Sequence, residues 1–371
     1  MLSSKELYRY SRQILLPELG VEGQQKIKES KVLVIGSGGL GSPVLLYLAS
    51  AGVGTLGVLD FDVVDESNLQ RQILFNTADV GKLKAITASE KIKQLNPFIT
   101  VLTFNEYLAS QNALDIITQF DLVVDGSDNL PTRYLVNDAC VLLNKPLIYG
   151  AIFQFEGQVS VFNELLKDGS RGPNYRDLFP QAPPPEMVPS CSEGGVLGVL
   201  PGIIGSMQAN EAIKVITGMG DTLGGRLLIF DALDFSTRYL KIKPDTNREP
   251  IKELIDYLEF CNPKHLVSVR ELSPVEVKEL IEHQYVQIID VRESVEYSIG
   301  NIGGINISLK LLDQNLSLIS KDKPVVVLCK SGGRSYQAVK KLNDLGYLNV
   351  MNLAGGLLQW KIEIDASLIV G

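Results

Sequence analysis

The sequence predicts an α/β fold with two domains, in which a larger domain with a mostly parallel sheet precedes a smaller α/β domain. Apolar runs of strand length alternate with segments of helical periodicity through roughly the first 150 residues. The glycine-rich turn GSGGLG stands between the first apolar run and the first helical segment. A polar stretch after residue 245 separates this pattern from a second, shorter one, and 371 residues are enough for two domains.

The elements of the larger domain follow one another in regular order. Strands are expected at 31–36, 55–62, 99–104, 121–128 and 146–152, with helices between them at 42–52, 82–96, 111–120 and 131–145. Strands and helices that alternate in this way imply right-handed crossovers and parallel strands. Two later segments, 158–163 and 225–243, are expected to form antiparallel strands. The Pro- and Gly-rich stretch 165–190 between them is expected to be a long loop.

The smaller domain repeats the alternation. Helices are expected at 273–283 and 335–346, and strands at 286–292, 324–330 and 349–356. We therefore place the larger domain at 1–245, a polar linker at 246–266 and the smaller domain at 267–371.

Composition and charge exclude several classes of protein. The net charge is −8 and the isoelectric point about 5.1, so neither a nucleic acid nor a membrane surface is expected as a partner. The charged N-terminal segment is unlike a secretory signal, and the most apolar stretch is too short to span a bilayer. Four cysteines without a C-x-x-C pair fit a reducing, cytoplasmic location; they are Cys140, Cys191, Cys261 and Cys329.

The glycine-rich turn predicts a nucleotide site. Gly36, Gly38 and Gly41 satisfy G-x-G-x-x-G after a strand and at the start of a helix, where free amides and the helix dipole favour an anion. Asp60 ends the next strand, where a carboxylate can bind ribose hydroxyls. These features alone fit an NAD-dependent oxidoreductase with an accessory domain equally well.

The following residues favour a triphosphate. Asn68, Arg71, Lys82 and Lys84 add polar and cationic groups beyond what a pyrophosphate needs, and a reaction at a phosphate builds further negative charge. Asp128 follows a later strand and is placed at the carboxyl edge of the sheet, where it can hold Mg²⁺. A solvated helix face would explain Arg71 or Lys84 singly, but explains the whole set poorly.

Several phrases resemble the MoeB/ThiF-type enzymes, which are prokaryotic relatives of ubiquitin-activating enzymes with a Rossmann-like fold. They are RYSRQILLPELG, GSGGLGSP, LDFDVVDESNLQRQ, DGSDNLPTRYLVND, GAIFQFEGQVSVF and GVLPGIIGSMQANEAIK, and the match covers about 1–240. The resemblance implies adenylation of the C-terminal glycine of a ubiquitin-like sulfur-carrier protein. It implies ATP contacts from Gly36, Gly38, Gly39, Gly41, Asp60, Ser67, Asn68, Arg71, Lys84, Asp128 and Asn129, with Mg²⁺ held by Asp128. Arg12 matches the arginine that the partner subunit contributes in this family, which implies a homodimer.

The resemblance has one clear departure. Family members usually bind structural Zn²⁺ through a C-x-x-C pair in the long loop and a second pair near the end of the domain. Here Asn174 and Asp177 stand at the first pair of positions, and the second pair is absent from KPDTNREP. No structural zinc is therefore expected. Cys191, in VPSCSEGGVLG, matches the loop cysteine of members that also transfer sulfur, although a small residue in a turn is the alternative.

The loop CKSGGRS predicts a reactive thiol at Cys329. The loop joins a strand to a helix, so its amides, the helix dipole and Arg334 would all favour the thiolate. It is one residue shorter than a tyrosine-phosphatase loop, which suits sulfur better than phosphate. Together with IIDVRESVEYSIGNIGGINI and NLAGGLLQW it resembles a single rhodanese domain over about 267–365, in which this cysteine carries a persulfide.

The combined pattern predicts an adenylyltransferase and sulfurtransferase that makes a thiocarboxylate on a MoaD-, ThiS- or Urm-like carrier. Catalytic roles are expected for Cys329, Cys191, Arg71 and Asp128, and the sulfur donor would be a protein such as a cysteine desulfurase. A rhodanese domain that only binds partners is the remaining alternative. The pathway stays open among molybdopterin, thiamine, cysteine and tRNA thiolation.

Overall fold

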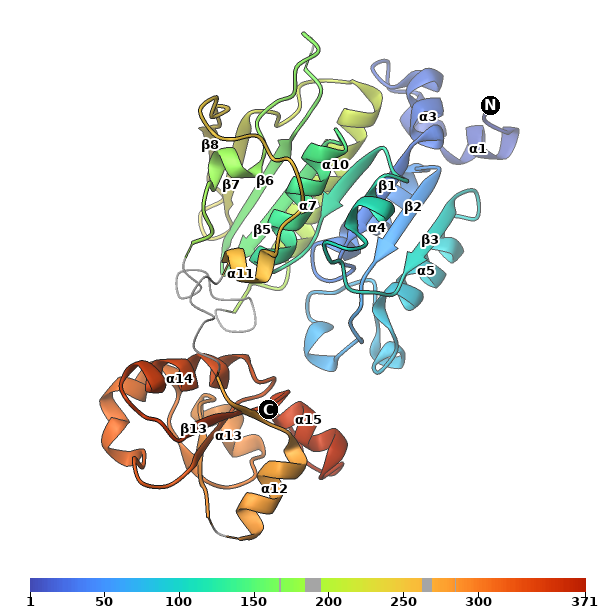
Figure 1. Cartoon of the computed structure of the whole chain (residues 1–371). Helices are drawn as coiled ribbons and strands as arrows, with labels where there is room; N and C mark the ends of the chain where they lie inside the picture. The colour runs from blue at the N-terminus through green and yellow to red at the C-terminus, as the bar shows by residue number, and fades with distance from the viewer. Residues whose placement is uncertain (167, 184–194, 262–268, 284) are drawn as a thin grey trace. The chain divides into compact units, whose positions relative to one another are not determined.

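The computed structural model describes residues 1–166, 168–183, 195–261, 269–283 and 285–371. The chain forms two compact units, Met1–Pro263 and Lys264–Gly371, each with its own sheet (Figure 1). The predicted α/β class is confirmed for both units. Predicted strands and helices appear in the predicted order, because the apolar periodicity of each segment decides its local structure.

The first unit contains an eight-stranded sheet in the order β3-β2-β1-β4-β5-β6-β7-β8. The first five strands pair in parallel and the last three are antiparallel, as predicted. The strands are β1 (Lys31–Ile35), β2 (Thr55–Leu59), β3 (Thr100–Phe104), β4 (Leu122–Asp125), β5 (Leu147–Phe153), β6 (Glu156–Phe162), β7 (Arg226–Asp231) and β8 (Thr237–Lys241). Because the strand order reverses between β1 and β4, their carboxyl ends open a crevice there.

Helices cover both faces of this sheet (Figure 1). The longer helices are α3 (Gly20–Glu29), α4 (Gly41–Ala51), α5 (Lys84–Leu95), α7 (Leu130–Leu142) and α10 (Leu200–Thr217). The shorter ones are α1 (Ser4–Arg9), α2 (Ser11–Ile14), α6 (Ala113–Ile117), α8 (Tyr175–Leu178) and α11 (Tyr257–Cys261), with single 3₁₀ turns η1 (Glu66–Asn68) and η2 (Thr77–Asp79). Helices α3, α4 and α10 pack together on one face, and α6, α7 and α11 on the other.

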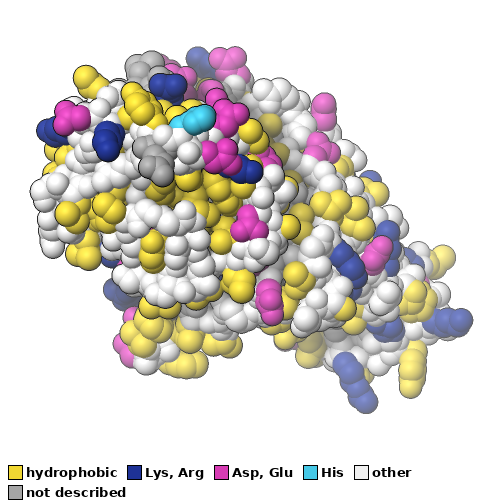
Figure 2. Space-filling view, turned by 90° about the horizontal axis from the view of Figure 1, so that it is seen from below, with side chains coloured by type: hydrophobic (Ala, Val, Ile, Leu, Met, Phe, Trp, Pro, Cys, Tyr) yellow, Lys and Arg dark blue, Asp and Glu magenta, His cyan; other side chains and the backbone are white. Residues whose placement is uncertain are grey.

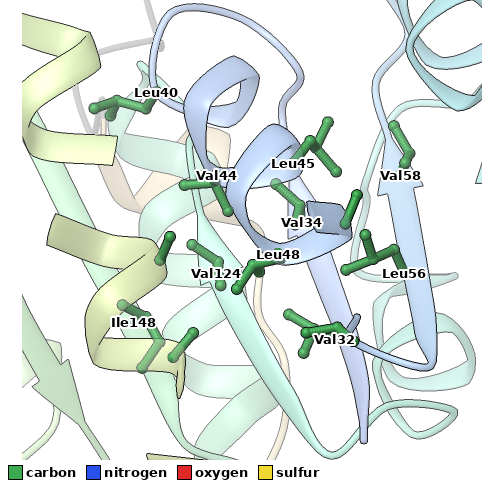
Figure 3. Packing of buried hydrophobic residues seen from close by; sticks show 14 of the residues in the cluster. Val32, Val34, Leu40, Val44, Leu45, Leu48, Leu56, Val58, Val124 and Ile148 are labelled. Atoms are coloured by element: carbon green, nitrogen blue, oxygen red, sulfur yellow. The ribbon is translucent and has the colours of Figure 1, made fainter. Parts of the chain in front are cut away.

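The core that fixes the crevice lies between α4 and the parallel strands. Val44, Leu45 and Leu48 of α4 are fully buried and pack with Val32 and Val34 of β1 (Figure 3). Burial of each such side chain contributes about 1.5–3 kcal/mol to folding. The start of α4, and with it the glycine turn, is therefore held against the end of β1.

Helix α11 lies within the range predicted as a linker, yet it packs against α7. Tyr257 is buried and its hydroxyl donates to Asp138 Oδ2 at 2.8 Å. Cys261 is also buried, and burial raises the pKa of its thiol to about 11. The polar composition of the preceding residues, 246–256, indicated a linker and gave no sign that Tyr257 and Cys261 are buried. Residues as far as 261 belong with the first unit.

The second unit has a five-stranded parallel sheet in the order β11-β10-β12-β13-β9. Its strands are β9 (Glu271–Leu272), β10 (Gln287–Asp290), β11 (Ile305–Asn306), β12 (Val325–Leu328) and β13 (Val350–Leu353). Its helices are α12 (Pro274–Glu282), α13 (Ser294–Ile299), α14 (Gly333–Asp344) and α15 (Gly356–Glu363), with the 3₁₀ segment η4 (Leu309–Leu318). The two-residue strands β9 and β11 are too short to show a periodic pattern, so the sequence did not predict them.

Charged side chains are dispersed over the surface shown in Figure 2, where basic and acidic groups are interspersed with apolar and uncharged ones. Among the described residues, none of the helices has the length and apolar character needed to cross a membrane.

Candidate active sites

A cavity of about 410 Å³ opens at the carboxyl edge of the parallel strands in the first unit. Its walls come from the segments that follow β1, β2 and β4 and from β5 and β6, so it occupies the reversal point of the strand order. Its lining includes these predicted site residues: Gly36, Gly38, Gly39, Asp60, Arg71, Lys84, Asp128 and Asn129.

The glycine turn needs glycine because the backbone folds back on itself. A Cβ at Gly41 would lie 1.8 Å from the carbonyl oxygen of Gly36, a distance that no side chain can occupy. Asp60 fixes the turn from the next strand, because its Oδ2 accepts from the Ser37 amide and hydroxyl at 2.8 Å each. Asp60 therefore shapes the turn as well as lining the cavity.

Two of the three predicted cations, Arg71 and Lys84, line the cavity. The third, Lys82, is not among the lining residues, and its Nζ pairs with Asp79 Oδ1 at 3.4 Å. Lys84 begins α5, is only 5% exposed, and its Nζ pairs with Asp62 Oδ2 at 3.0 Å. Arg71 donates from Nη1 to the carbonyl oxygen of Ser67 at 3.2 Å. A buried lysine that faces a cavity is not part of a solvated helix face, so the alternative interpretation fails for Lys84.

Asp128 and Asn129 follow β4 and line the same cavity. Asn129 is the N-cap of α7, and its Oδ1 accepts from the Thr132 amide at 3.0 Å. Asp128 lies immediately before this cap and lines the cavity. Mg²⁺ bound to nucleotide phosphates usually takes one or two protein carboxylates, so Asp128 fits this mode. Among the described residues, no cluster of three or more His, Cys, Asp or Glu side chains forms a self-sufficient metal site.

Arg133 is a third cation at the cavity, and the sequence did not predict it. It lies 5.7 Å from the centre of the Tyr149 ring, and its Nη2 donates to the Ser127 carbonyl oxygen at 3.3 Å. Its buried Nε has no hydrogen-bond partner, and neither has the buried Oδ2 of Asp125. Burial raises the pKa of Asp125 despite the charge of Arg133. Arg133 lies one helical turn after Asn129, a predicted site residue. This spacing could have indicated from the sequence that Arg133 lies near the site.

Part of the cavity wall is aromatic. Tyr149, Phe153, Tyr175 and Phe179 line it, with Gln158 as a polar member. Tyr149 is buried and burial raises the pKa of its phenol, so the hydroxyl stays protonated. Such a wall can accept a small uncharged segment next to the charged groups of the crevice.

Other predicted site residues lie apart from this cavity. Gly41, Ser67 and Asn68 are not among its lining residues, although Ser67 is bonded to Arg71. Arg12 is exposed on α2 and lines a separate hollow with residues of α4 and α10. Cys191 lies outside the described residues.

The two positions expected to replace zinc cysteines carry hydrogen bonds. Asn174 is the N-cap of α8, and its backbone amide donates to Asp177 Oδ2 at 2.7 Å. The Oδ1 of Asp177 accepts from the Asp245 amide at 2.9 Å and pairs with Arg248 at 3.1 Å. The segment that follows β8 is therefore tied to α8 by a carboxylate.

Cys329 directly follows β12 in the second unit and is 1% exposed. Its Sγ accepts from the Gly332 amide at 3.2 Å and from the Ser335 hydroxyl at 3.3 Å. The prediction that loop amides point at the sulfur is confirmed for Gly332, while Ser335 is an additional donor. Arg334, predicted to favour the thiolate, forms an ion pair with Glu296.

The loop around Cys329 is shaped by α15. The amides of Leu357 and Leu358 donate to the carbonyl oxygens of Cys329 and Lys330 at 2.9 and 3.0 Å. A Cβ at Gly356 would lie 2.5 Å from the Cys329 carbonyl oxygen and 2.6 Å from the Gly332 nitrogen. The second glycine of NLAGG is thus required by the thiol loop.

Gly356→Ala should lower Cys329-dependent sulfur transfer from thiosulfate to cyanide by about 10²-fold, because the added methyl group displaces the loop. Gly346→Ala is the matched control, since Gly346 also has a positive φ but no atom within 4 Å of an added Cβ. It should lose some stability and keep transfer. Equal activity in the two variants would show that the contact does not shape the reactive loop.

Together the fold and the two sites define a nucleotide-binding α/β protein joined to a domain with the thiol loop of a sulfurtransferase. Residues 10–251 match the ThiF family and residues 273–363 match the rhodanese-like domain. The chain belongs to the ThiF family and carries a C-terminal rhodanese domain.

Its relatives share both domains or the first alone. The chain is 46% identical over 378 residues to the probable adenylyltransferase/sulfurtransferase MoeZ of Mycobacterium tuberculosis, covering 100% of this chain and 96% of the relative. It is 42% identical to adenylyltransferase and sulfurtransferase MOCS3 of Drosophila yakuba, covering 99% and 85%. The sulfur carrier protein adenylyltransferase of Thermus thermophilus is 52% identical over 70% of this chain and 98% of the relative.

Solved structures share the fold of the first unit. Escherichia coli MccB with AMPCPP and MccA superposes with a TM-score of 0.59 at 22% identity, over 67% of this chain and 75% of that chain. PaaA superposes with a TM-score of 0.56 at 26% identity, over 65% and 75%.

Proposed function

We propose that this chain uses ATP to adenylate the C-terminal glycine of a ubiquitin-like sulfur-carrier protein and converts it to a thiocarboxylate with sulfur carried on Cys329. The observation that carries the proposal is the cavity itself. It combines a glycine turn at a helix start with Arg71, Lys84 and Arg133, and part of its wall is aromatic. The names of the relatives support the same activity.

In the first step, a carboxylate oxygen of the carrier forms a bond to the α-phosphorus of ATP. The bond from that phosphorus to the bridging oxygen breaks, and pyrophosphate leaves with the electron pair. Lys84 and Arg71 stabilise the negative charge that builds on the phosphates. Arg133, whose Nε is unpartnered, is suited to bind the carrier carboxylate. Asp128 would hold Mg²⁺, which supplies further neutralisation of phosphate charge when bound.

In the second step, the terminal sulfur of a Cys329 persulfide attacks the acyl carbon and AMP leaves. This forms an acyl disulfide between the carrier and Cys329. Cys191 has two alternative roles. It resolves this disulfide by attacking the Cys329 sulfur, which releases the thiocarboxylate and leaves a Cys191–Cys329 disulfide that a cellular thiol reduces. Alternatively, it forms a thioester with the carrier before the persulfide attacks. The carrier carboxylate, which is a poor electrophile, is thus activated by adenylation, and the sulfur nucleophile is supplied separately as a persulfide.

Three further properties belong to the proposal. The exposed position of Arg12, away from the cavity of its own chain, supports a homodimer in which each subunit supplies this arginine to its partner. A protein such as a cysteine desulfurase would supply the sulfur. The free thiols of Cys140, Cys261 and Cys329 support a reducing, cytoplasmic location.

The test is direct. The protein is incubated with ATP, magnesium, a sulfur donor and candidate carriers that end in Gly-Gly, and each carrier is then weighed by mass spectrometry. The expected product shows one sulfur-for-oxygen exchange and requires ATP. Binding of NADH in place of ATP, measured by fluorescence titration, would overturn the proposal in favour of an oxidoreductase.

A further inference from the structure

One of the two cations of the thiol loop, Arg334, is neutralised by a carboxylate from another helix. Arg334 lies in the first turn of α14, and its Nη1 and Nη2 donate to the two carboxylate oxygens of Glu296 at 2.6 Å each. Such a two-point pair fixes both side chains in one plane. Their side chains are 18% and 24% exposed, so solvent screens the pair only in part.

Glu296 is held in place independently of Arg334. Arg292, fully buried with Asp290, donates to the Glu296 carbonyl oxygen at 3.2 Å and to the Gly300 carbonyl oxygen at 2.8 Å. The Glu293 amide donates to Glu296 Oε2 at 3.0 Å. Burial alone would raise the pKa of Glu296, but the hydrogen bonds from Arg334 and Glu293 lower it overall. The carboxylate is therefore ionised at neutral pH.

This pair changes what the loop can attract. The loop carries two cations, Lys330 and Arg334, and two uncompensated positive charges would favour a doubly charged oxyanion such as thiosulfate. Glu296 cancels one of them, which leaves a single positive charge beside Cys329. A single charge suits a donor that brings one negative charge or none.

We infer that Glu296 is a specificity-determining residue that tunes the Cys329 loop to accept sulfur from a persulfide carried on a thiol, and against dianionic oxyanion donors. This inference rests on the proposed sulfur-transfer function. In the loading step the Cys329 thiolate forms a bond to the outer sulfur of the donor persulfide. The donor's S–S bond breaks, and the donor thiolate leaves with the electron pair. With thiosulfate the same step releases sulfite.

Two small donors that differ chiefly in charge test the inference. Thiosulfate carries two negative charges and methanethiosulfonate carries one, while both deliver a sulfane sulfur to a thiolate. Glu296→Gln keeps the size of the side chain and an oxygen that can accept from the Glu293 amide, but removes its charge. Transfer to cyanide is measured in the full-length protein at several ionic strengths. Glu282→Gln, at an exposed position on α12, is the matched control.

Glu296→Gln should lower the KM for thiosulfate about five- to tenfold. Removal of the carboxylate raises the net positive charge of the thiol loop by one, and this charge attracts the second negative charge of thiosulfate. The KM for methanethiosulfonate should change no more than about twofold, and added salt should shrink the difference. Glu296→Asp, which keeps the charge, and Glu282→Gln should behave like the native protein.

Other outcomes overturn the inference. An equal change for both donors, or an unchanged KM for thiosulfate, would show that Glu296 does not act through charge. Loss of transfer from both donors in Glu296→Gln would assign Glu296 a loop-holding role instead. Absence of Cys329-dependent transfer in the native protein would refute the proposed function itself, which separates the two failures.

Discussion

Cys329→Ala should abolish formation of the carrier thiocarboxylate while ATP–pyrophosphate exchange proceeds at the native rate. In the proposed function the sulfur is carried on this thiol, whose Sγ accepts from the Gly332 amide and the Ser335 hydroxyl. Alanine leaves those donors without the atom that they position. The exchange reaction uses only the cavity of the first unit. Mass spectrometry of the carrier and exchange of labelled pyrophosphate measure the two steps separately.

Cys261→Ala is the control for this variant. Cys261 is also buried, and burial raises the pKa of its thiol to about 11, so it is a poor nucleophile at neutral pH. This control should still form the thiocarboxylate. A Cys329→Ala protein that lost exchange as well would contradict the independence of the two units. One that still formed thiocarboxylate would remove Cys329 from the reaction.

Asp128→Ala should lower carrier-dependent ATP–pyrophosphate exchange by about 10²- to 10³-fold, since charge stabilisation at the phosphates is lost in the transition state. Asp128 lines the same cavity as Lys84 and Arg71 and is next to the α7 cap at Asn129. The cap is made by Asn129, so the substitution leaves it intact. Rates are measured at saturating ATP over a range of magnesium concentrations.

Asp115→Ala, at an exposed position on α6, is the matched control and should exchange normally. Sulfur transfer from thiosulfate to cyanide should be unchanged in both variants, because it uses the second unit alone. An Asp128→Ala protein that exchanges at the native rate, with the native dependence on magnesium, would remove Asp128 from the metal site.

The parts of the fold that the sequence predicted are those decided locally. Strands β1 and β12 are apolar runs, and each is followed by a glycine turn, in which Gly41 has a close backbone contact and Gly332 has a positive φ. Strand, turn and helix are adjacent in the chain, so the positions of Gly36 and Cys329 could be inferred from spacing. The charge that a triphosphate requires indicated Arg71, Lys84 and Asp128, resemblance to known families then supported them, and all three line the cavity.

The parts that the sequence could not predict depend on contacts between distant segments. Glu296 and Arg334 form an ion pair although 38 positions separate them in the sequence, and no periodic pattern predicts such a pair. Tyr257 packs in an apolar cluster with residues of α7, and its hydroxyl donates to Asp138. The partners of Asp177 likewise come from a segment that follows β8. Each contact is set by tertiary packing, which overrides what local composition indicates.

The bond between Asp60 and the glycine turn has a thermodynamic consequence for ligand capture. Ser37 is tied to Asp60 through its amide and its hydroxyl, and Gly41 presses against Gly36. The cradle is therefore rigid before any nucleotide arrives. A rigid receptor loses little conformational entropy on association, so more of the contact energy remains available for affinity and for turnover.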